Sequence, residues 1–295
     1  MDQESDSQQE LSAIEDSIRA RYLSDGFTAA LTRSFQKFLM VFYASRGRDL
    51  PWRRTVDPYQ ILVSEFMLQQ TRVERVLVKY PEFLGHFPDI GALARSPRNE
   101  VLRAWQGLGY NRRALALHET ARRIRDEFHG SIPLDRTLLD SFPGIGGATA
   151  GAIMVFSTNR PEIFIETNIR RVYIHLFFPG ATKVRDREIE PILGKTLDKK
   201  HPREFYYALM DYGSALKKGT GNPNARSASF SRQSPFEGSD RQVRGMVLRR
   251  LLAGGGAHEE DLRGLVPVEP GRLERILKGL EKDGFIERSG DRIRC

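Results

Sequence analysis

The sequence predicts a mainly helical, all-α fold followed by a small C-terminal winged helix-turn-helix. Apolar residues recur at spacings of three and four over 59–70, 71–84 and 115–128, the pattern of helices that bury one face. Ser96-Pro97 marks a further helix start, with Pro at the first helical position. Segments that alternate like strands are few before residue 285. The 295 residues, 40% of them hydrophobic, suffice for two or three domains with cores.

The beginning of the chain is distinguished by its charge. Residues 1–18 carry six acidic side chains and no Lys or Arg. Acidic stretches at chain ends are commonly solvated and poorly packed. We therefore expect the acidic start to be frayed and solvated, as part of an acidic N-terminal segment over residues 1–28.

A tight turn is predicted at 143–147, before a helix that begins near Ala148. Pro143 fixes one backbone angle, and Gly144 and Gly146 permit conformations that a side chain would block. Such a turn directs the first backbone N–H groups of the helix outward. A helix N-terminus of this kind is an anion site that suits a nucleic-acid phosphate.

The C-terminal third is basic at first and then changes character. Residues 217–250 carry eight Lys and Arg against two acids. The stretch 217–239 is predicted to be a basic linker, whose charges are either simply solvated or follow a nucleic-acid backbone. Beyond it, 240–295 shows three helical segments and a short hairpin, the order of a winged helix-turn-helix. Such a module binds either DNA or another protein.

Composition narrows the classes of function. Cys295 is the only cysteine, so one chain forms neither a disulfide, nor a four-cysteine zinc site, nor a four-thiolate iron–sulfur cluster. No apolar run reaches a membrane span and no signal peptide opens the chain, so we expect a soluble protein of the cytoplasm or nucleoid. A formal net charge of +8 favours an anionic partner.

Two carboxylates are candidates for chemistry. On a helix, Glu65 has Ile61, Leu62 and Leu68 as neighbours three and four positions away, so desolvation should raise its pKa and keep a proton available. Glu166 precedes a predicted helix that begins near Ile169, and a helix N-terminus favours its ionised form. The alternatives are a surface glutamate at position 65 and a simple helix cap at position 166.

Two loops carry residues suited to separating stacked bases. Gln69, Gln70 and Thr71 join two predicted helices, and Gly107 to Tyr110 form a tight loop. Amides and an aromatic ring on loop tips can wedge into a base stack. The alternative is a pair of ordinary polar turns.

Together these segments resemble the helix-hairpin-helix (HhH-GPD) DNA glycosylases. They are most similar to the MutY-type adenine glycosylases, with the archaeal mismatch thymine glycosylases close behind. The resemblance covers about residues 35–216 and implies two helical lobes with a DNA-binding cleft between them. The motifs that carry it are Pro51-Trp52-Arg53, Asp57-Pro58-Tyr59, residues 63–71, Trp105 to Tyr110, Pro143 to Ile153, and Glu166 to Val172.

The resemblance implies roles for individual residues. Glu65 corresponds to the acid that protonates adenine at N7, and Glu166 to the catalytic carboxylate that stabilises the oxocarbenium-like sugar. Asn168 corresponds to a residue that supports that site. Residues expected to contact DNA or the flipped base are Gln69, Gln70, Thr71, Leu108, Tyr110, Arg53, Gly144 and Gly146, with Ala148 and Tyr207 at the base pocket.

The chain also departs from the family pattern. Position 166 has Glu where the family has Asp, so the carboxylate lies one methylene further from the backbone. Ala148 stands where lyase-type relatives have a nucleophilic Lys, which makes lyase activity an unexpected property. Tyr207 stands where adenine enzymes often have Glu or Gln. The cluster cysteines expected after residue 215 are absent, and 217–239 takes the place of their loop.

The resemblance predicts a monofunctional DNA glycosylase of base excision repair that flips and removes adenine opposite guanine or 8-oxoguanine. We expect a monomer acting on double-stranded DNA with a mispair or lesion, with no cofactor, no resident metal and no membrane partner. The hairpin carbonyls are a candidate site for a monovalent cation. The glycosylase core is expected over 29–216, with a six-helix barrel over about 55–160 and a second lobe from 29–54 and 161–216.

Two other functions remain open at this point. The first is a thymine or uracil glycosylase that acts on mismatches with guanine. The second is a catalytically idle protein that binds lesion-containing DNA or recruits partners, because one extra methylene at Glu166 could misplace its carboxylate.

Overall fold

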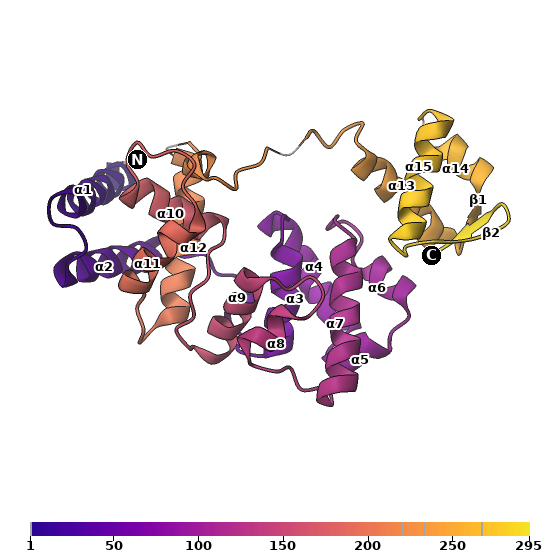
Figure 1. The fold of residues 1–295 in the computed structure, drawn as a ribbon, viewed down its shortest axis with the longest axis horizontal. Helices are drawn as coiled ribbons and strands as arrows, with labels where there is room; N and C mark the ends of the chain where they lie inside the picture. Colours follow the sequence, from indigo (N-terminus) through magenta and orange to yellow (C-terminus); the bar gives the residue numbers. More distant parts are fainter. Residues whose placement is uncertain (1, 220, 233, 267) are drawn as a thin grey trace. The chain divides into compact units, whose positions relative to one another are not determined.

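The chain is mainly helical, as predicted (Figure 1). The computed structural model describes residues 2–219, 221–232, 234–266 and 268–295. None of the helices in this described part combines the length and hydropathy needed to cross a lipid bilayer. The elements in chain order are α1 (Asp2–Asp25), α2 (Ala29–Arg46), η1 (Pro51–Arg53), α3 (Pro58–Leu68), α4 (Val73–His86), α5 (Ile90–Arg95), α6 (Arg98–Ala104), α7 (Arg112–Phe128), α8 (Arg136–Asp140), α9 (Gly147–Thr158), α10 (Thr167–Phe177), α11 (Asp186–Thr196), α12 (Pro202–Gly219), η2 (Pro223–Arg226), α13 (Asp240–Gly254), β1 (Ala257–His258), α14 (Glu259–Leu265), α15 (Pro270–Lys282), β2 (Glu287–Ser289) and β3 (Arg292–Arg294).

The chain forms two compact units that do not follow its linear order. Unit 1 contains residues 1–61, 134–141 and 145–231, and unit 2 contains 62–133, 142–144 and 232–295. Helices α8 and α9 therefore belong with unit 1, and the C-terminal module belongs with unit 2. The division into the four sequence segments described above stays a prediction.

Unit 1 has an aromatic core between α2, α10 and α12. The ring of Phe35 contacts Tyr173, Phe177 and Phe205 edge-on, with ring centroids 5.4 to 6.3 Å apart. All four rings are fully buried. Buried aromatic rings supply much of the apolar area that stabilises a core of this size. This packing fixes α10, the helix that begins just after Glu166.

The prediction that the acidic start is frayed is wrong for residues 11–18, which pack as part of α1. Leu11 and Ile18 are buried, and the ring of Tyr22 packs against Phe177. These residues recur at helical spacing among the acids, so their apolar stripe buries one face while the charges remain on the other. A hydrogen bond between Glu15 and the ring of His175, 3.1 Å long, adds a polar link to α10.

Unit 2 packs α5 and α6 against α7, and α4 against α6. The indole of Trp105 is fully buried and meets the ring of Phe83 edge-on at 5.8 Å. The Pro97 expected at the first helical position is instead the N-cap of α6. The core around Trp105 matters for the site because the loop 107–110 follows it directly.

The C-terminal elements of unit 2 are confirmed at their predicted positions. Helices α13, α14 and α15 precede the hairpin β2–β3, and Leu251, Leu277 and Phe285 are buried among them. One strand was not predicted: β1 pairs antiparallel with β3, which gives a three-stranded sheet in the order β1-β3-β2. A two-residue strand carries too short a pattern to be recognised. This order of elements agrees with the expected winged helix-turn-helix, an assignment that stays a prediction.

Part of the expected linker, residues 223–227, is packed rather than solvated. Arg226 donates to the carbonyl oxygens of Ile174 at 2.9 Å and Phe178 at 2.5 Å, and Ser227 forms a bridge with Val184. The last carbonyls of a helix have no partners within it, and an arginine can satisfy them. The charge of Arg226 is therefore used to cap α10.

Candidate active site

Gly144 makes the turn before α9 possible. Its φ of +77° is in the left-handed region, and a Cβ there would lie 2.8 Å from Phe66 and 2.9 Å from Ala116. Any side chain would therefore clash as well as strain the backbone. The Gly144 carbonyl accepts a hydrogen bond of 3.1 Å from the side-chain amide of Gln69, so the hairpin is tied to the end of α3.

Gly146 does not adopt a conformation that a side chain would block, so that part of the expectation is wrong. Gly146 is the N-cap of α9 with φ −107° and ψ 173°, an extended conformation that any residue adopts. A Cβ built there meets no atom within 4 Å. Gly146, Gly147 and Ala148 are exposed, so the start of α9 is accessible and a phosphate contact there stays a prediction.

Glu166 is itself the N-cap of α10, which begins two residues earlier than expected. Its Oε1 accepts hydrogen bonds from the backbone N–H of Asn168 at 2.7 Å and of Ile169 at 2.9 Å, and its Oε2 accepts one from the side-chain amide of Asn168 at 3.1 Å. The extra methylene relative to Asp is thus accommodated by a fully bonded cap.

The pKa of Glu166 shifts in the direction opposite to the expected one. Burial raises the pKa above its ordinary value, although the two backbone N–H groups and the charges of Arg171 and Arg170 lower it. Desolvation disfavours the carboxylate more than the helix start favours it. The ionised form of Glu166 is therefore held at a free-energy cost.

Arg171 and its hydrogen-bond partners form a supporting layer behind Glu166 that the sequence alone did not reveal. Arg171 donates to the Oδ1 atom of Asn168, to Asn222 Oδ1 at 3.0 Å and to the carbonyl of Gly213 at 3.4 Å. Asn168 is in this way held from both ends, by Glu166 and by Arg171. The signal that could have found Arg171 is its spacing of three from Asn168 on one helix.

Replacing Gly213 with Ala should destabilise this layer. A Cβ at Gly213 would lie 2.1 Å from the backbone oxygen of Asn168, so α12 and α10 must move apart. We expect a loss of about 1–3 kcal/mol in the free energy of unfolding, measured by urea denaturation. Gly245→Ala is the matched control, because Gly245 is also within a helix but a Cβ there meets nothing within 4 Å. Equal stability of the two variants would contradict the close approach.

Glu65 lies on α3 in unit 2, and its surroundings agree in part with the prediction. Ile61 and Leu62 are fully buried, whereas Leu68 and Glu65 itself are half-buried. The carboxylate therefore stands at the edge of an apolar face. Glu65 belongs to unit 2, whereas Glu166 belongs to unit 1.

The two loops expected to meet DNA share an unusual backbone feature. Gln70 has φ +54° and Tyr110 has φ +49°, both in the left-handed region that non-glycine residues seldom adopt. Gln70 is exposed, and Tyr110 is 38% exposed. The Thr71 hydroxyl lies 3.4 Å from the Leu108 carbonyl. Leu108 is 2% exposed and packs in the core, and its contact with a base stays a prediction.

Arg53 and Tyr207 are buried together in unit 1. Arg53 donates from both terminal nitrogens to the two oxygens of Asp211, each at 2.8 Å. Its guanidinium lies 4.5 Å from the centroid of the Tyr207 ring, which stacks on Phe156 at 4.7 Å. Arg48 adds a second pair of bonds to Asp211. Contact of Arg53 or Tyr207 with a base stays a prediction. Asp211 was not identified from the sequence, because it lies 158 residues from Arg53 along the chain.

Burial alone would raise the pKa of Asp211. The hydrogen bonds and charge of Arg53, with those of Arg48, outweigh burial and hold that pKa below its ordinary value. Asp211 is therefore a buried carboxylate that stays ionised to unusually low pH.

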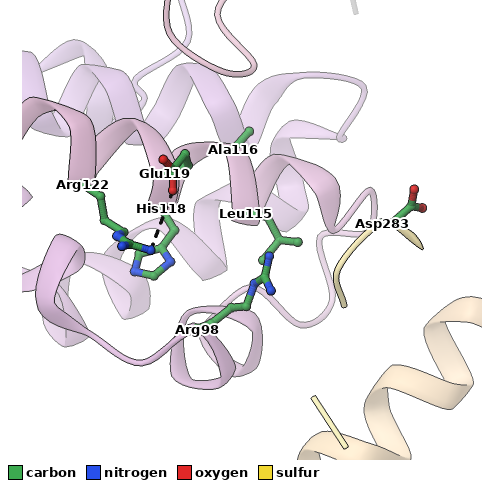
Figure 2. A pocket seen from close by; sticks show the side chains of 7 residues that line it. All are labelled: Arg98, Leu115, Ala116, His118, Glu119, Arg122 and Asp283. Carbon is green, nitrogen blue, oxygen red and sulfur yellow. Dashed lines mark ion pairs between the residues drawn. The ribbon is translucent and has the colours of Figure 1, made fainter. Parts of the chain in front are cut away.

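A pocket of about 420 Å³ lies elsewhere in unit 2 and includes none of the predicted site residues (Figure 2). Arg98, His118 and Arg122 line it, and Arg122 pairs with Glu119 at 3.9 Å. Burial and the nearby arginines lower the pKa of His118. Two carboxylates in the lining offset the two arginines, so we assign no ligand to it. Among the described residues, no three His, Cys, Asp or Glu side chains gather as metal ligands.

The glycine turn between α8 and α9 and the carboxylate cap of α10 agree with the helix-hairpin-helix class that the sequence resembles. Comparison with known proteins agrees. The family model described as HhH-GPD superfamily base excision DNA repair protein matches residues 63–197. An adenine DNA glycosylase of Mycobacterium tuberculosis is 34% identical over 278 residues, which cover 86% of this chain and 90% of that protein. One from Buchnera aphidicola is 35% identical over 190 residues, 63% of this chain and 53% of that protein.

Solved structures show the same fold. A thermostable thymine-DNA glycosylase has a TM-score of 0.56 at 24% identity, over 62% of this chain and 86% of its own. An endonuclease III–DNA complex has a TM-score of 0.56 at 18% identity, over 65% and 89%. The chain spans about half the length of the Buchnera enzyme and nine tenths of the mycobacterial one. The chain belongs to the HhH-GPD superfamily of base excision DNA repair proteins, on the branch of the adenine DNA glycosylases.

Proposed function

We propose that this chain is a monofunctional DNA glycosylase of base excision repair that removes adenine from a mispair with guanine or 8-oxoguanine. The observation that carries the proposal is the 34% identity to an adenine DNA glycosylase along nine tenths of that relative. The thymine-DNA glycosylase shares the fold at 24% identity, which supports the fold alone. Adenine is therefore the leading substrate.

The reaction cleaves the N-glycosidic bond of a flipped adenine. Glu65, at the edge of the apolar face of α3, supplies a proton to the base, since protonation makes adenine a better leaving group. Glu166 supplies the negative charge that stabilises the developing oxocarbenium-like sugar. The side-chain amide of Asn168 donates to the Glu166 carboxylate, and Arg171 in turn donates to Asn168. Water then takes the place of the base on the sugar.

The remaining features of the proposal follow from individual residues. Ala148, exposed near the start of α9, has no nucleophile, so we propose hydrolysis without an efficient lyase step. Hydrolysis of this kind requires no cofactor. The carbonyls of Pro143 and Gly144 each accept one side-chain hydrogen bond, and a further lone pair on each remains for a monovalent cation. We propose a monomer acting on duplex DNA with a mispair.

A single-turnover cleavage assay tests the function directly. The duplexes carry A opposite G, A opposite 8-oxoguanine, T opposite G, or U opposite G, and alkali reveals abasic sites. We expect adenine release from the first two only. Glu65→Gln should slow release by about 100- to 1000-fold, because a general acid contributes typically 10²–10⁴-fold. Glu74→Gln on the exposed side of α4 is the matched control and should leave the rate unchanged.

Each other outcome has a definite meaning. Release of T or U would assign the chain to mismatch-pyrimidine repair. Tight, salt-dependent binding without any product would favour a catalytically idle lesion-binding protein. Adenine release that survives Glu65→Gln would remove Glu65 from the chemistry while leaving the substrate assignment intact.

A further inference from the structure

Arg113 is a buried arginine whose position no catalytic role explains. It is the second residue of α7 and only 9% exposed. Burial lowers its pKa to about 10, although the nearby Tyr110 raises it. Every hydrogen bond that the structure describes for Arg113 goes to a backbone carbonyl or to one hydroxyl. A buried cation held by neutral acceptors alone is uncommon and points to a specific task.

One terminal nitrogen of Arg113 closes the end of α3. Nη1 donates to the carbonyl oxygens of Phe66 at 2.7 Å, Met67 at 3.0 Å and Gln69 at 2.5 Å. These carbonyls belong to the last turn of the helix and the residue just beyond it, where no intrahelical donor is available. The positive charge also suits the negative end of the helix dipole.

The other terminal nitrogen reaches the second loop. Nη2 donates to the Thr71 hydroxyl at 2.8 Å, to the Gly109 carbonyl at 3.0 Å and, more weakly, to the Leu108 carbonyl at 3.4 Å. The guanidinium carbon also lies 5.4 Å from the Trp105 ring centroid and 5.6 Å from that of Tyr110. One planar group therefore joins the loop 69–71 to the loop 107–110.

The two joined loops are the ones that hold Gln70 and Tyr110 in left-handed backbone conformations. Such conformations persist only when the surroundings hold them in place. We propose that Arg113 is a positioning residue that sets both DNA-reading loops before DNA binds, so that Gln70 and Tyr110 enter the duplex together. This inference rests on the proposed function, since it assumes that these loops separate the bases.

A lysine at position 113 should not be able to position both loops, although it carries the same positive charge as arginine. An arginine fans its N–H groups over two loops in a fixed plane, whereas an ammonium is a point donor on a flexible stem. Arg113→Lys should therefore fold but leave one loop without its partner. Arg112→Lys is the matched control, because Arg112 is the preceding residue and its exposed side chain pairs with Asp283 instead.

The experiment combines three measurements on the full chain. Hydrogen exchange of the amides in 69–71 and 107–110, without DNA, should be faster in Arg113→Lys and unchanged in Arg112→Lys, at equal global stability. Extrusion of 2-aminopurine placed at the adenine position, followed by its fluorescence, should fall about tenfold. The single-turnover rate of adenine release should fall about tenfold to a hundredfold, as expected for a misplacement near 1 Å.

The outcomes separate this inference from the proposed function. Wild-type exchange and extrusion in Arg113→Lys would overturn the positioning role, whatever the enzyme cleaves. A wild-type chain that releases no base would overturn the proposed function, while loop exchange still decides the role of Arg113. A fall in global stability with no selective change in the two loops would make Arg113 a general packing residue and would also overturn the inference.

Discussion

Glu166→Gln should lower adenine release by on the order of a thousandfold while leaving the protein folded. Removing one group that stabilises transition-state charge costs about 10²–10³-fold in rate, and a full carboxylate charge lies at or beyond the upper end of that range. The glutamine oxygen can still accept from the backbone N–H groups of Asn168 and Ile169, as the glutamate does at 2.7 and 2.9 Å. The cap of α10 is therefore kept, whereas the charge and the hydrogen bond from the side-chain amide of Asn168 are lost.

The stability of Glu166→Gln should change in the direction opposite to its activity. Because burial raises the pKa of Glu166, folding favours its protonated form. The stability that this group contributes is present below its unfolded pKa and is lost as pH rises through its folded pKa. Above that folded pKa the wild-type protein thus holds a carboxylate at a cost that glutamine avoids. Glu166→Gln should be at least as stable as wild type above the folded pKa of Glu166.

The measurements are single-turnover rates and urea unfolding for Glu166→Gln, Glu166→Asp and a control, Glu188→Gln. Glu188 lies in the first turn of α11 and accepts a backbone hydrogen bond, so it tests capping without the proposed chemistry. Glu166→Asp keeps the charge and a good cap, and we expect activity within about tenfold of wild type. A Glu166→Gln enzyme that cleaves at the wild-type rate would remove Glu166 from the mechanism.

Local sequence patterns predicted the framework of the site well. Apolar spacing located α3, α4 and α7, and the glycine-rich turn located the start of α9 to within a residue. Glu166 was recognised at a helix start, because a polar residue before an apolar periodic run marks an N-cap. These features depend on residues close together in the chain, so one sequence is enough to show them.

The errors come from interactions between distant residues. Nothing near Asp211 in sequence indicates that it will meet Arg53 and Arg48, and nothing near Arg113 indicates two loops around it. The pKa of Glu166 was misjudged for the same reason: the helix start is visible in the sequence, but the desolvation around it is a product of packing. Burial and cross-element hydrogen bonds require the fold before they can be counted.

Asp211→Asn should produce the largest loss of stability, about 3–5 kcal/mol. Asp211 is a 2% exposed carboxylate that accepts four hydrogen bonds from Arg53 and Arg48, and Arg53 itself is 6% exposed. The amide removes the negative charge and leaves the guanidinium of Arg53 buried without a counterion. Removing one partner of a buried ion pair in this way destabilises a protein by much more than the intact pair stabilises it. Urea unfolding at neutral pH measures the loss.

The pH dependence gives this prediction its sharpest test. The depressed pKa of Asp211 means that its contribution is present above the unfolded pKa, about 3.9, and is lost as pH falls through the lower folded value. The stability gap between wild type and Asp211→Asn should therefore be full at neutral pH and close only in strong acid. Asp49→Asn breaks a pair with Arg54 in which both side chains are exposed, and it should show no gap at any pH. A gap of the same size for both variants would show that burial does not govern the energy of these pairs.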